Sequence, residues 1–245
     1  MNRTPIGQVA SIARYPVKSM GGESLNRTHV AAYGLYGDRS HAFADESLEG
    51  WERYFTARGI PQLLKYQAKL VEGTASANEF PPIRVTSPDG HEFTWDEGLL
   101  GEIQGYSKRK ISMIRYRPDS RDSLAVDAGG ILIITDRTLN KLEHFLGREV
   151  DQRRFRANLV VTISDDRVQD EAELVGKRLR IGEVQLEVTE ACERCSMITL
   201  DPDTLERDVA ILKKVNEQFN LRFGVYASVV EVGDIGVDDT VYMEA

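Results

Sequence analysis

The chain has 245 residues, of which 41% are hydrophobic and 29% are charged, a mixture typical of globular proteins that excludes a disordered or fibrous chain. Thirty-one Lys and Arg against 39 Asp and Glu give a net charge of −8, which argues against a nucleic-acid partner. No stretch approaches the roughly 18 apolar residues of a membrane span. The first thirty residues also lack the apolar core of a secretory signal. We therefore expect a cytoplasmic protein with no membrane span.

Short segments rich in Val, Ile and Thr, bounded by Gly, Pro or Asp, predict strands along most of the chain. These segments are residues 7–14, 27–33, 66–72, 82–86, 91–95, 110–117, 130–134, 158–164, 178–189, 222–232 and 236–243. Ser87-Pro88-Asp89-Gly90 separates two of them. Because Pro presets φ and Gly admits a positive φ, this sequence predicts a tight turn. Residues 82–95 are therefore expected to form a hairpin.

Two segments change to the apolar spacing of a helix. Residues 136–147 place Leu and Phe side chains on one face, with Thr135 or Asp136 as an N-terminal cap and Gly147 as the terminator. Residues 205–219 repeat this pattern with a similar apolar stripe.

The order of these elements predicts the fold class. Residues 96–105 are a third, short helix candidate, so strands far outnumber helices and do not alternate regularly with them. This order favours a mostly β protein with a few helices, built as a largely antiparallel β-barrel. The polar, turn-rich segment 117–123 predicts a boundary near residue 120. We expect regions 1–120 and 121–245 to pack closely together.

The only two cysteines stand in the sequence Cys192-Glu193-Arg194-Cys195. A thiol–disulfide pair would normally open a helix, whereas β-branched residues follow here. A structural zinc site needs about four ligands, and the four histidines of the chain have no ligand spacing. Two buried cysteines acting as small hydrophobes are a further reading. The remaining one is a single metal-binding or nucleophilic thiolate favoured by the charge of Arg194.

A second feature is a set of cations in turn-like segments at predicted strand ends. Lys18, Arg39 and Arg156 have this placement, with Ser19 and Asn158 as polar neighbours. Such residues can converge on a phosphate group through charge-assisted hydrogen bonds. Each cation taken alone is better explained as a surface ion-pair partner.

Five segments in one order carry a family resemblance. They are Tyr15-Pro16-Val17-Lys18-Ser19, Gly34 with Gly37-Asp38-Arg39, Phe155-Arg156-Ala157-Asn158, Cys192-Glu193-Arg194-Cys195 and Thr199-Leu200-Asp201-Pro202-Asp203-Thr204. Together they resemble the MOSC family, named for the C-terminal domain of molybdenum cofactor sulfurase, and its mitochondrial amidoxime-reducing members. The resemblance implies a MOSC-type barrel over 121–245, packed with a smaller N-terminal β-rich domain over 1–120.

The resemblance also implies roles for individual residues. Cys195 matches the cysteine that binds molybdenum in amidoxime-reducing members and that is thought to carry sulfur in sulfurase members. Six further positions match residues that contact the molybdenum cofactor (Mo-molybdopterin), namely Lys18, Ser19, Arg39, Thr135, Arg156 and Asn158. Glu193 and Ala157 depart from the family's frequent Ser and Pro. A carboxylate at position 193 would change the charge and hydrogen bonding around the metal.

The function that this resemblance implies is reduction of N-oxygenated compounds such as hydroxylamines, N-oxides or amidoximes. Cys195 would be the metal ligand and catalytic residue. Asp38 is a candidate for proton delivery, with an ion pair to Arg39 as the alternative. Two cysteines cannot supply the four ligands of a typical iron–sulfur cluster. We therefore expect electrons from a separate ferredoxin-like or cytochrome b5-like protein.

Two other functions remain open. The protein could transfer sulfur through a persulfide on Cys195, which a pyridoxal-phosphate-dependent cysteine desulfurase would supply as a partner. It could also be a non-catalytic carrier that binds and delivers the molybdenum cofactor.

Overall fold

The computed structural model describes residues 3–71, 78–120, 124–126 and 128–244. These residues form mostly β-structure with three α-helices, α1 (Glu97–Gln104), α2 (Asp136–Leu146) and α3 (Val209–Phe219). The strands are β1 (Arg3–Arg14), β2 (Glu23–Leu25), β3 (Arg27–Ala31), β4 (Gly34–Leu35), β5 (His41–Ala44), β6 (Gln67–Leu70), β7 (Ile83–Thr86), β8 (Glu92–Phe93), β9 (Ser112–Arg115), β10 (Ile131–Thr135), β11 (Leu159–Ile163), β12 (Arg178–Ile181), β13 (Val184–Glu193), β14 (Arg222–Glu231), β15 (Gly233–Gly236) and β16 (Thr240–Glu244). Short 3-10 helices are η1 (Gly50–Arg53), η2 (Pro61–Lys65), η3 (Gln152–Phe155), η4 (Glu171–Leu174) and η5 (Ser196–Thr199).

Seven strands close into a barrel, in the order β11, β10, β14, β13, β12, β16 and β1, with β1 pairing back onto β11. Adjacent strands are antiparallel except for the parallel pair β10 and β11. The closure at β1 and β11 is so tight that a Cβ on Gly7 would lie 2.0 Å from the Thr162 oxygen. Val9, Leu186 and Val225 belong to the apolar cluster that fills the barrel. The predicted β-barrel is confirmed.

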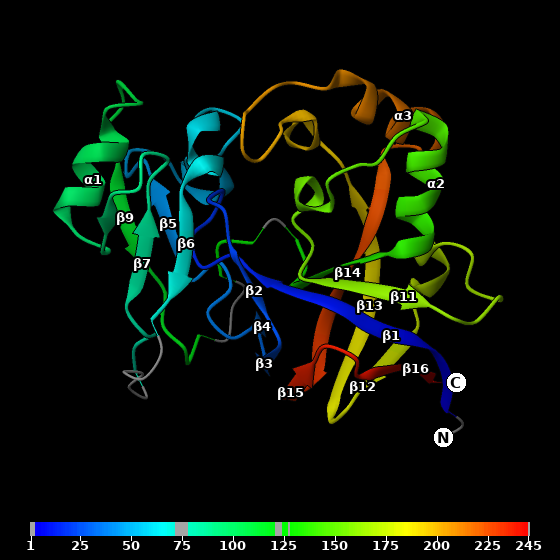
Figure 1. Ribbon diagram of the computed structural model, residues 1–245. Helices are drawn as coiled ribbons and strands as arrows, with labels where there is room; N and C mark the ends of the chain where they lie inside the picture. The colour runs from blue at the N-terminus through cyan, green and yellow to red at the C-terminus, as the bar shows by residue number, and fades with distance from the viewer. Residues whose placement is uncertain (1–2, 72–77, 121–123, 127, 245) are drawn as a thin grey trace.

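Helices α2 and α3 lie side by side on the outside of the barrel (Figure 1). Thr135 caps the N-terminus of α2, and Gly147 ends it with φ +69°. A separate apolar cluster, which includes Leu142, Val215 and Phe223, lies between these helices and the barrel wall. The predicted helix over 136–147 is therefore confirmed, together with its cap and its terminator.

The N-terminal part packs around its own apolar cluster, at the far side from α2 and α3 (Figure 1). It contains the pair β5–β9, the sheet β6–β7–β8 and helix α1. The predicted hairpin over 82–95 is confirmed, because Val85 pairs with Phe93. Gly90 has the positive φ, +89°, that the turn needs.

Three predicted elements differ from the structure. The single strand predicted over 236–243 is wrong, because residues 237–239 separate β15, which ends at Gly236, from β16, which begins at Thr240. The single strand predicted over 178–189 is wrong, because a turn at Gly182 with φ +57° divides it into β12 and β13. The helix predicted over 205–219 begins only at Val209, since the Asp208 side chain caps it by accepting from the Ala210 amide.

The domain boundary near residue 120 stays a prediction. The strand pairing shows that β1, from the first region, lies within the barrel formed by the second. No helix in the described part of the chain is long and apolar enough to span a membrane.

Candidate functional site

A cavity of about 460 Å³ brings together most of the predicted site residues. They are Lys18, Ser19, Arg39, Arg156, Asn158 and Cys195. Asp38 and Thr135 are the two predicted site residues that do not line this cavity. A volume of this size is ordinary for a site that holds a small molecule or cofactor.

Lys18 lies in the turn between β1 and β2 and is only 5% exposed. Its backbone amide donates to the His41 oxygen, and its Nζ donates to the Ala125 oxygen at 2.8 Å. The Nζ atom also lies 5.0 Å from the centre of the Trp51 ring, a cation–π distance. Ser19 follows with φ +68° in a left-handed turn. The turn thereby places both residues on the cavity wall.

Arg39 and Arg156 share the ring of Tyr15. Their guanidinium carbons lie 4.7 and 4.2 Å from the centre of that ring. Both residues have a left-handed backbone, with φ +48° and +52°. Burial raises the pKa of the Tyr15 phenol, an effect that the charges of Arg156 and Arg39 oppose. The neutral ring thus forms an apolar support beneath two cations.

Asp38 lies buried beside Arg39. Its carboxylate accepts hydrogen bonds from the Tyr15 amide, at 2.7 Å, and from Arg39 Nη1. The ion pair with Arg39 is therefore the contact that the structure shows. A part for Asp38 in proton delivery stays a prediction.

Asn158 is buried immediately before β11, and its side-chain amide contacts three segments. Its Oδ1 accepts from the Leu132 amide at 3.0 Å and from Arg39 Nη1 at 3.2 Å. Its Nδ2 donates to the Ala13 oxygen at 3.2 Å. Asn158 therefore ties β1 to β10 and orients Arg39 at the cavity wall.

Thr135 is fully buried at the end of β10, where its side chain caps helix α2. Its hydroxyl accepts from the Thr138 amide at 3.2 Å and donates to the Glu171 carboxylate at 2.7 Å. Burial raises the pKa of that carboxyl group. The structure thus gives Thr135 a capping contact and does not bring it to the cavity.

The two cysteines are free thiols in different surroundings. Cys192 is buried in the apolar cluster beneath α2 and α3, as a small hydrophobe would be. Cys195 is exposed at the first position before η5. An exposed thiol on a cavity wall can ligate a soft metal or accept sulfur.

Arg194 points its guanidinium into the protein. Its Nε donates to the Phe223 oxygen at 2.6 Å and its Nη1 to the Phe155 oxygen at 2.9 Å. Arg194 therefore fastens the thiol-bearing turn to the segment before Arg156. Glu193, on the other side of Arg194, is exposed and lines the cavity.

Several lining residues were not predicted as site residues, among them Trp51, Arg58 and Tyr226. Trp51 is 38% exposed, and the guanidinium carbon of Arg58 lies 4.4 Å from the centre of its ring. Trp51 and Arg58 belong to no periodic pattern. The only signal in the sequence for this part of the site was a Trp in an otherwise polar segment.

The donor set of the cavity suits the molybdenum cofactor. Three cations, Lys18, Arg39 and Arg156, line the same cavity in a chain whose net charge is −8. Clustered cations bind phosphate groups through charge-assisted hydrogen bonds. The thiol of Cys195 adds a soft ligand for a metal. The residues present therefore fit a phosphate-bearing, metal-containing cofactor.

Comparisons with known proteins identify the relatives of this chain. Family models match residues 6–124 as a MOSC N-terminal beta barrel domain and residues 121–242 as a MOSC domain. Mitochondrial amidoxime reducing component 2 of Homo sapiens is 33% identical, over 97% of this chain and 83% of that protein. Molybdenum cofactor sulfurase of Caenorhabditis elegans is 24% identical over 89% of this chain, which spans only 33% of that longer protein.

Among solved structures, the YUAD protein from Bacillus subtilis has the same fold. The two structures superpose with a TM-score of 0.52 at 13% identity, over 99% of this chain and 97% of the other. The two domain matches and the likeness to amidoxime reducing components together identify the family. The chain belongs to the MOSC family, with a MOSC domain preceded by a MOSC N-terminal β-barrel domain.

Proposed function

We propose that this protein is a molybdenum-cofactor oxidoreductase that reduces N-oxygenated compounds such as hydroxylamines, N-oxides and amidoximes. The observation that carries the proposal is the placement of the exposed Cys195 thiol on the same cavity as Lys18, Arg39 and Arg156. The similarity to amidoxime reducing components supports reduction as the reaction.

The chain's own residues bind and orient the cofactor in this proposal. Lys18, Arg39 and Arg156 bind its phosphate group, and the Ser19 hydroxyl adds a hydrogen bond. Asn158 acts by holding Arg39 in place. Cys195 supplies the thiolate ligand of the metal. When bound, the cofactor supplies the two-electron chemistry that removes oxygen from nitrogen.

Electrons must come from outside the chain. Its sequence has two cysteines, fewer than the four that typically ligate an iron–sulfur cluster. A separate electron-transfer protein, ferredoxin-like or cytochrome b5-like, is therefore the proposed partner. The cytoplasm is the proposed location.

Sulfur transfer is the second candidate function. The exposure of Cys195 and the similarity to molybdenum cofactor sulfurase favour it. In that case the Cys195 thiolate would attack a persulfide sulfur on a cysteine desulfurase and take over its outer sulfur. The desulfurase cysteine would leave as the thiolate, so no external oxidant is needed.

Metal analysis and turnover together distinguish these functions. Protein purified from a molybdenum-competent host is expected to contain about one molybdenum and one pterin per chain and to oxidise reduced benzyl viologen with an amidoxime or a hydroxylamine. Bound molybdenum without turnover of either substrate would identify a cofactor carrier. No molybdenum, with a persulfide on Cys195 after mixing with a desulfurase and cysteine, would identify sulfur transfer.

A further inference from the structure

Two short turns carry the principal residues of the candidate site. The 3-10 helix η3 ends at Phe155 and leads directly into Arg156, whereas η5 begins immediately after Cys195. Neither turn is part of the barrel sheet. Because a short 3-10 turn makes few hydrogen bonds of its own, the spacing between these turns depends on contacts made by side chains.

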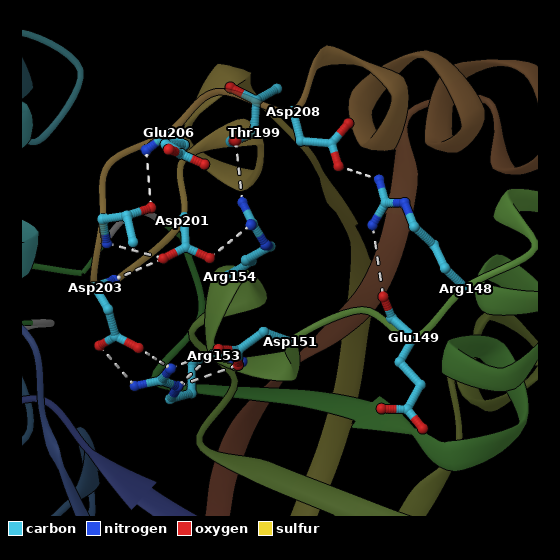
Figure 2. Close-up of polar contacts among 11 residues, drawn as sticks. Arg148, Glu149, Asp151, Arg153, Arg154, Thr199, Asp201, Asp203, Glu206 and Asp208 are labelled. Carbon is cyan, nitrogen blue, oxygen red and sulfur yellow. Dashed lines mark hydrogen bonds and ion pairs between the residues drawn. The ribbon is translucent and has the colours of Figure 1, made fainter.

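Both ends of the thiol-bearing turn are tied to η3. At its start, Arg194 Nη1 donates to the Phe155 oxygen at 2.9 Å. At its end, Arg154 Nη1 donates to the Thr199 oxygen at 3.0 Å, as Figure 2 shows. The η5 turn is therefore attached to η3 at two points, one on each side of the Cys195–Thr199 segment.

Asp201 holds Arg154 in the orientation that this attachment needs. Its Oδ2 accepts from Arg154 Nη2 at 2.9 Å, next to the contact with Thr199 (Figure 2). Its Oδ1 accepts from the backbone amides of Asp203 and Thr204 at 3.0 and 2.9 Å. The pair is largely shielded, since the side chains of Arg154 and Asp201 are 10% and 25% exposed. Charge-assisted hydrogen bonds in such surroundings are stronger than exposed ones.

We propose that Arg154 and Asp201 are positioning residues, which hold the Cys195 thiol at a fixed distance from the Arg156 guanidinium. The inference rests on the proposed function, because that spacing matters when one cofactor is bound by both residues. Arg154 and Asp201 act through the two turns that they join. A cofactor bound at one end by a thiolate and at the other by cations needs this spacing to be set before it binds.

The chain contains a matched control for this pair. Arg153 and Asp203 join the same two segments through contacts of 3.1 and 2.5 Å (Figure 2). Their side chains are 52% and 59% exposed, and Arg153 also pairs with Asp151. In Figure 2, neither the Arg153 nor the Asp203 side chain contacts a backbone oxygen of η5. An exposed ion pair of this kind contributes little to stability.

A nitroxide spin label on Cys195 tests the proposal without the cofactor. In a Cys192→Ala background Cys195 is the only thiol, and the width of the label's spectrum reports the mobility of the turn. Asp201→Asn keeps an oxygen for the backbone amides of Asp203 and Thr204 but faces Arg154 with an NH₂ group. It is expected to raise the label's rotational rate at least threefold, whereas Asp203→Asn leaves the spectrum unchanged.

Arg154→Lys is the second variant, because one ammonium group can hold Thr199 or Asp201 but cannot reproduce the fixed two-point geometry. Arg154→Lys is expected to give a rotational rate of the label between those of the wild type and Asp201→Asn. Circular dichroism at the same temperature verifies that each variant is folded. Equal spectra for Asp201→Asn, Arg154→Lys and Asp203→Asn would overturn the proposal.

Molybdenum content is the second readout. The molybdenum-to-protein ratio is expected to fall at least threefold in Asp201→Asn and to be unchanged in Asp203→Asn. Equal ratios would overturn the link between the Arg154–Asp201 pair and cofactor binding. Wild-type protein that binds no molybdenum would contradict the proposed function, whereas the spin-label result would still show whether Arg154 and Asp201 fix the turn.

Discussion

The guanidinium of Arg39 donates a hydrogen bond of 3.2 Å to the backbone oxygen of Arg156, which lies 117 residues further along the chain. Arg39 comes from the region matched by the N-terminal barrel domain and Arg156 from the region matched by the MOSC domain. The candidate site therefore forms only where the two regions pack together. Within this site, Arg39 holds the backbone of Arg156 in place.

Replacing Arg156 by Ala is expected to lower cofactor binding much more than stability. The change removes a phosphate-binding cation, together with one hydrogen bond to the Met20 oxygen of 2.7 Å. Loss of that bond costs about 1 kcal/mol, or a few degrees in Tm for a chain of this size. Molybdenum content should fall at least tenfold. Arg167→Ala is the control, because that side chain is 67% exposed, and its molybdenum content should not change. An equal loss in both variants would contradict the phosphate-binding role.

Thr135→Val tests whether Thr135 acts as a helix cap. The change removes its contacts with the Thr138 amide and the Glu171 carboxylate. We expect a loss of about 1–3 kcal/mol in the free energy of unfolding, measured by urea titration, with molybdenum content unchanged. Thr135→Ser keeps the hydroxyl and should retain most of the stability. A fall in molybdenum content at unchanged stability would show that Thr135 contacts the cofactor.

His41 makes stability depend on pH. Burial, with the nearby charge of Arg115, lowers the pKa of the folded imidazole to about 3. In the unfolded chain the imidazole takes up a proton near pH 6.5. The stability that depends on neutral His41 is therefore fully present above that pH and falls as the pH drops toward 3. At pH 5 the loss is about 2 kcal/mol relative to pH 7.5.

In the wild type, His41 Nδ1 lies 2.9 Å from Ser40 Oγ. His41→Asn is the matched variant, because the Asn side-chain amide can still donate a hydrogen bond to Ser40 Oγ. Urea titrations at pH 5 and pH 7.5 measure how much free energy of unfolding is lost at the lower pH. This loss should be about 2 kcal/mol smaller in the variant than in the wild type. The same pH dependence in wild type and variant would mean that His41 is not responsible.

Glu193 is expected to tune the reduction potential of the bound metal. Its exposed carboxylate lines the cavity, and a negative charge there disfavours the electron-rich reduced state. Glu193→Ser should therefore raise the potential measured by redox titration at matched molybdenum content. Glu190→Ser, an exposed position on the same strand outside the cavity lining, should leave it unchanged. An unchanged potential in Glu193→Ser would remove this carboxylate from the mechanism.

The barrel and the site cations could be predicted because both leave local signals. Strands such as β10 and β11 are short β-branched runs, and Lys18, Arg39 and Arg156 stand where such runs end or begin. The division of 178–189 into two strands was missed, because its apolar pattern continues through the single turn glycine, Gly182.

Contacts between distant segments explain the other differences. The membership of β1 in the barrel depends on its pairing with β11 and β16, which no local pattern encodes. Thr135 was linked to the cofactor by resemblance, but its orientation is set by a carboxylate 36 residues away, Glu171. Trp51 lies in the short 3-10 helix η1, and its ring meets Lys18 and Arg58 only in the folded chain.

Molybdenum X-ray absorption on the loaded protein tests the central claim, that Cys195 ligates the metal, most directly. Wild type and Cys192→Ser should show the same number of sulfur neighbours, since the Cys192 thiol is buried in an apolar cluster whereas the Cys195 thiol is exposed on the cavity wall. Cys195→Ser should show one sulfur neighbour fewer and one more oxygen or nitrogen, with loss of amidoxime-dependent turnover. An unchanged sulfur count in Cys195→Ser at equal molybdenum content would contradict the account.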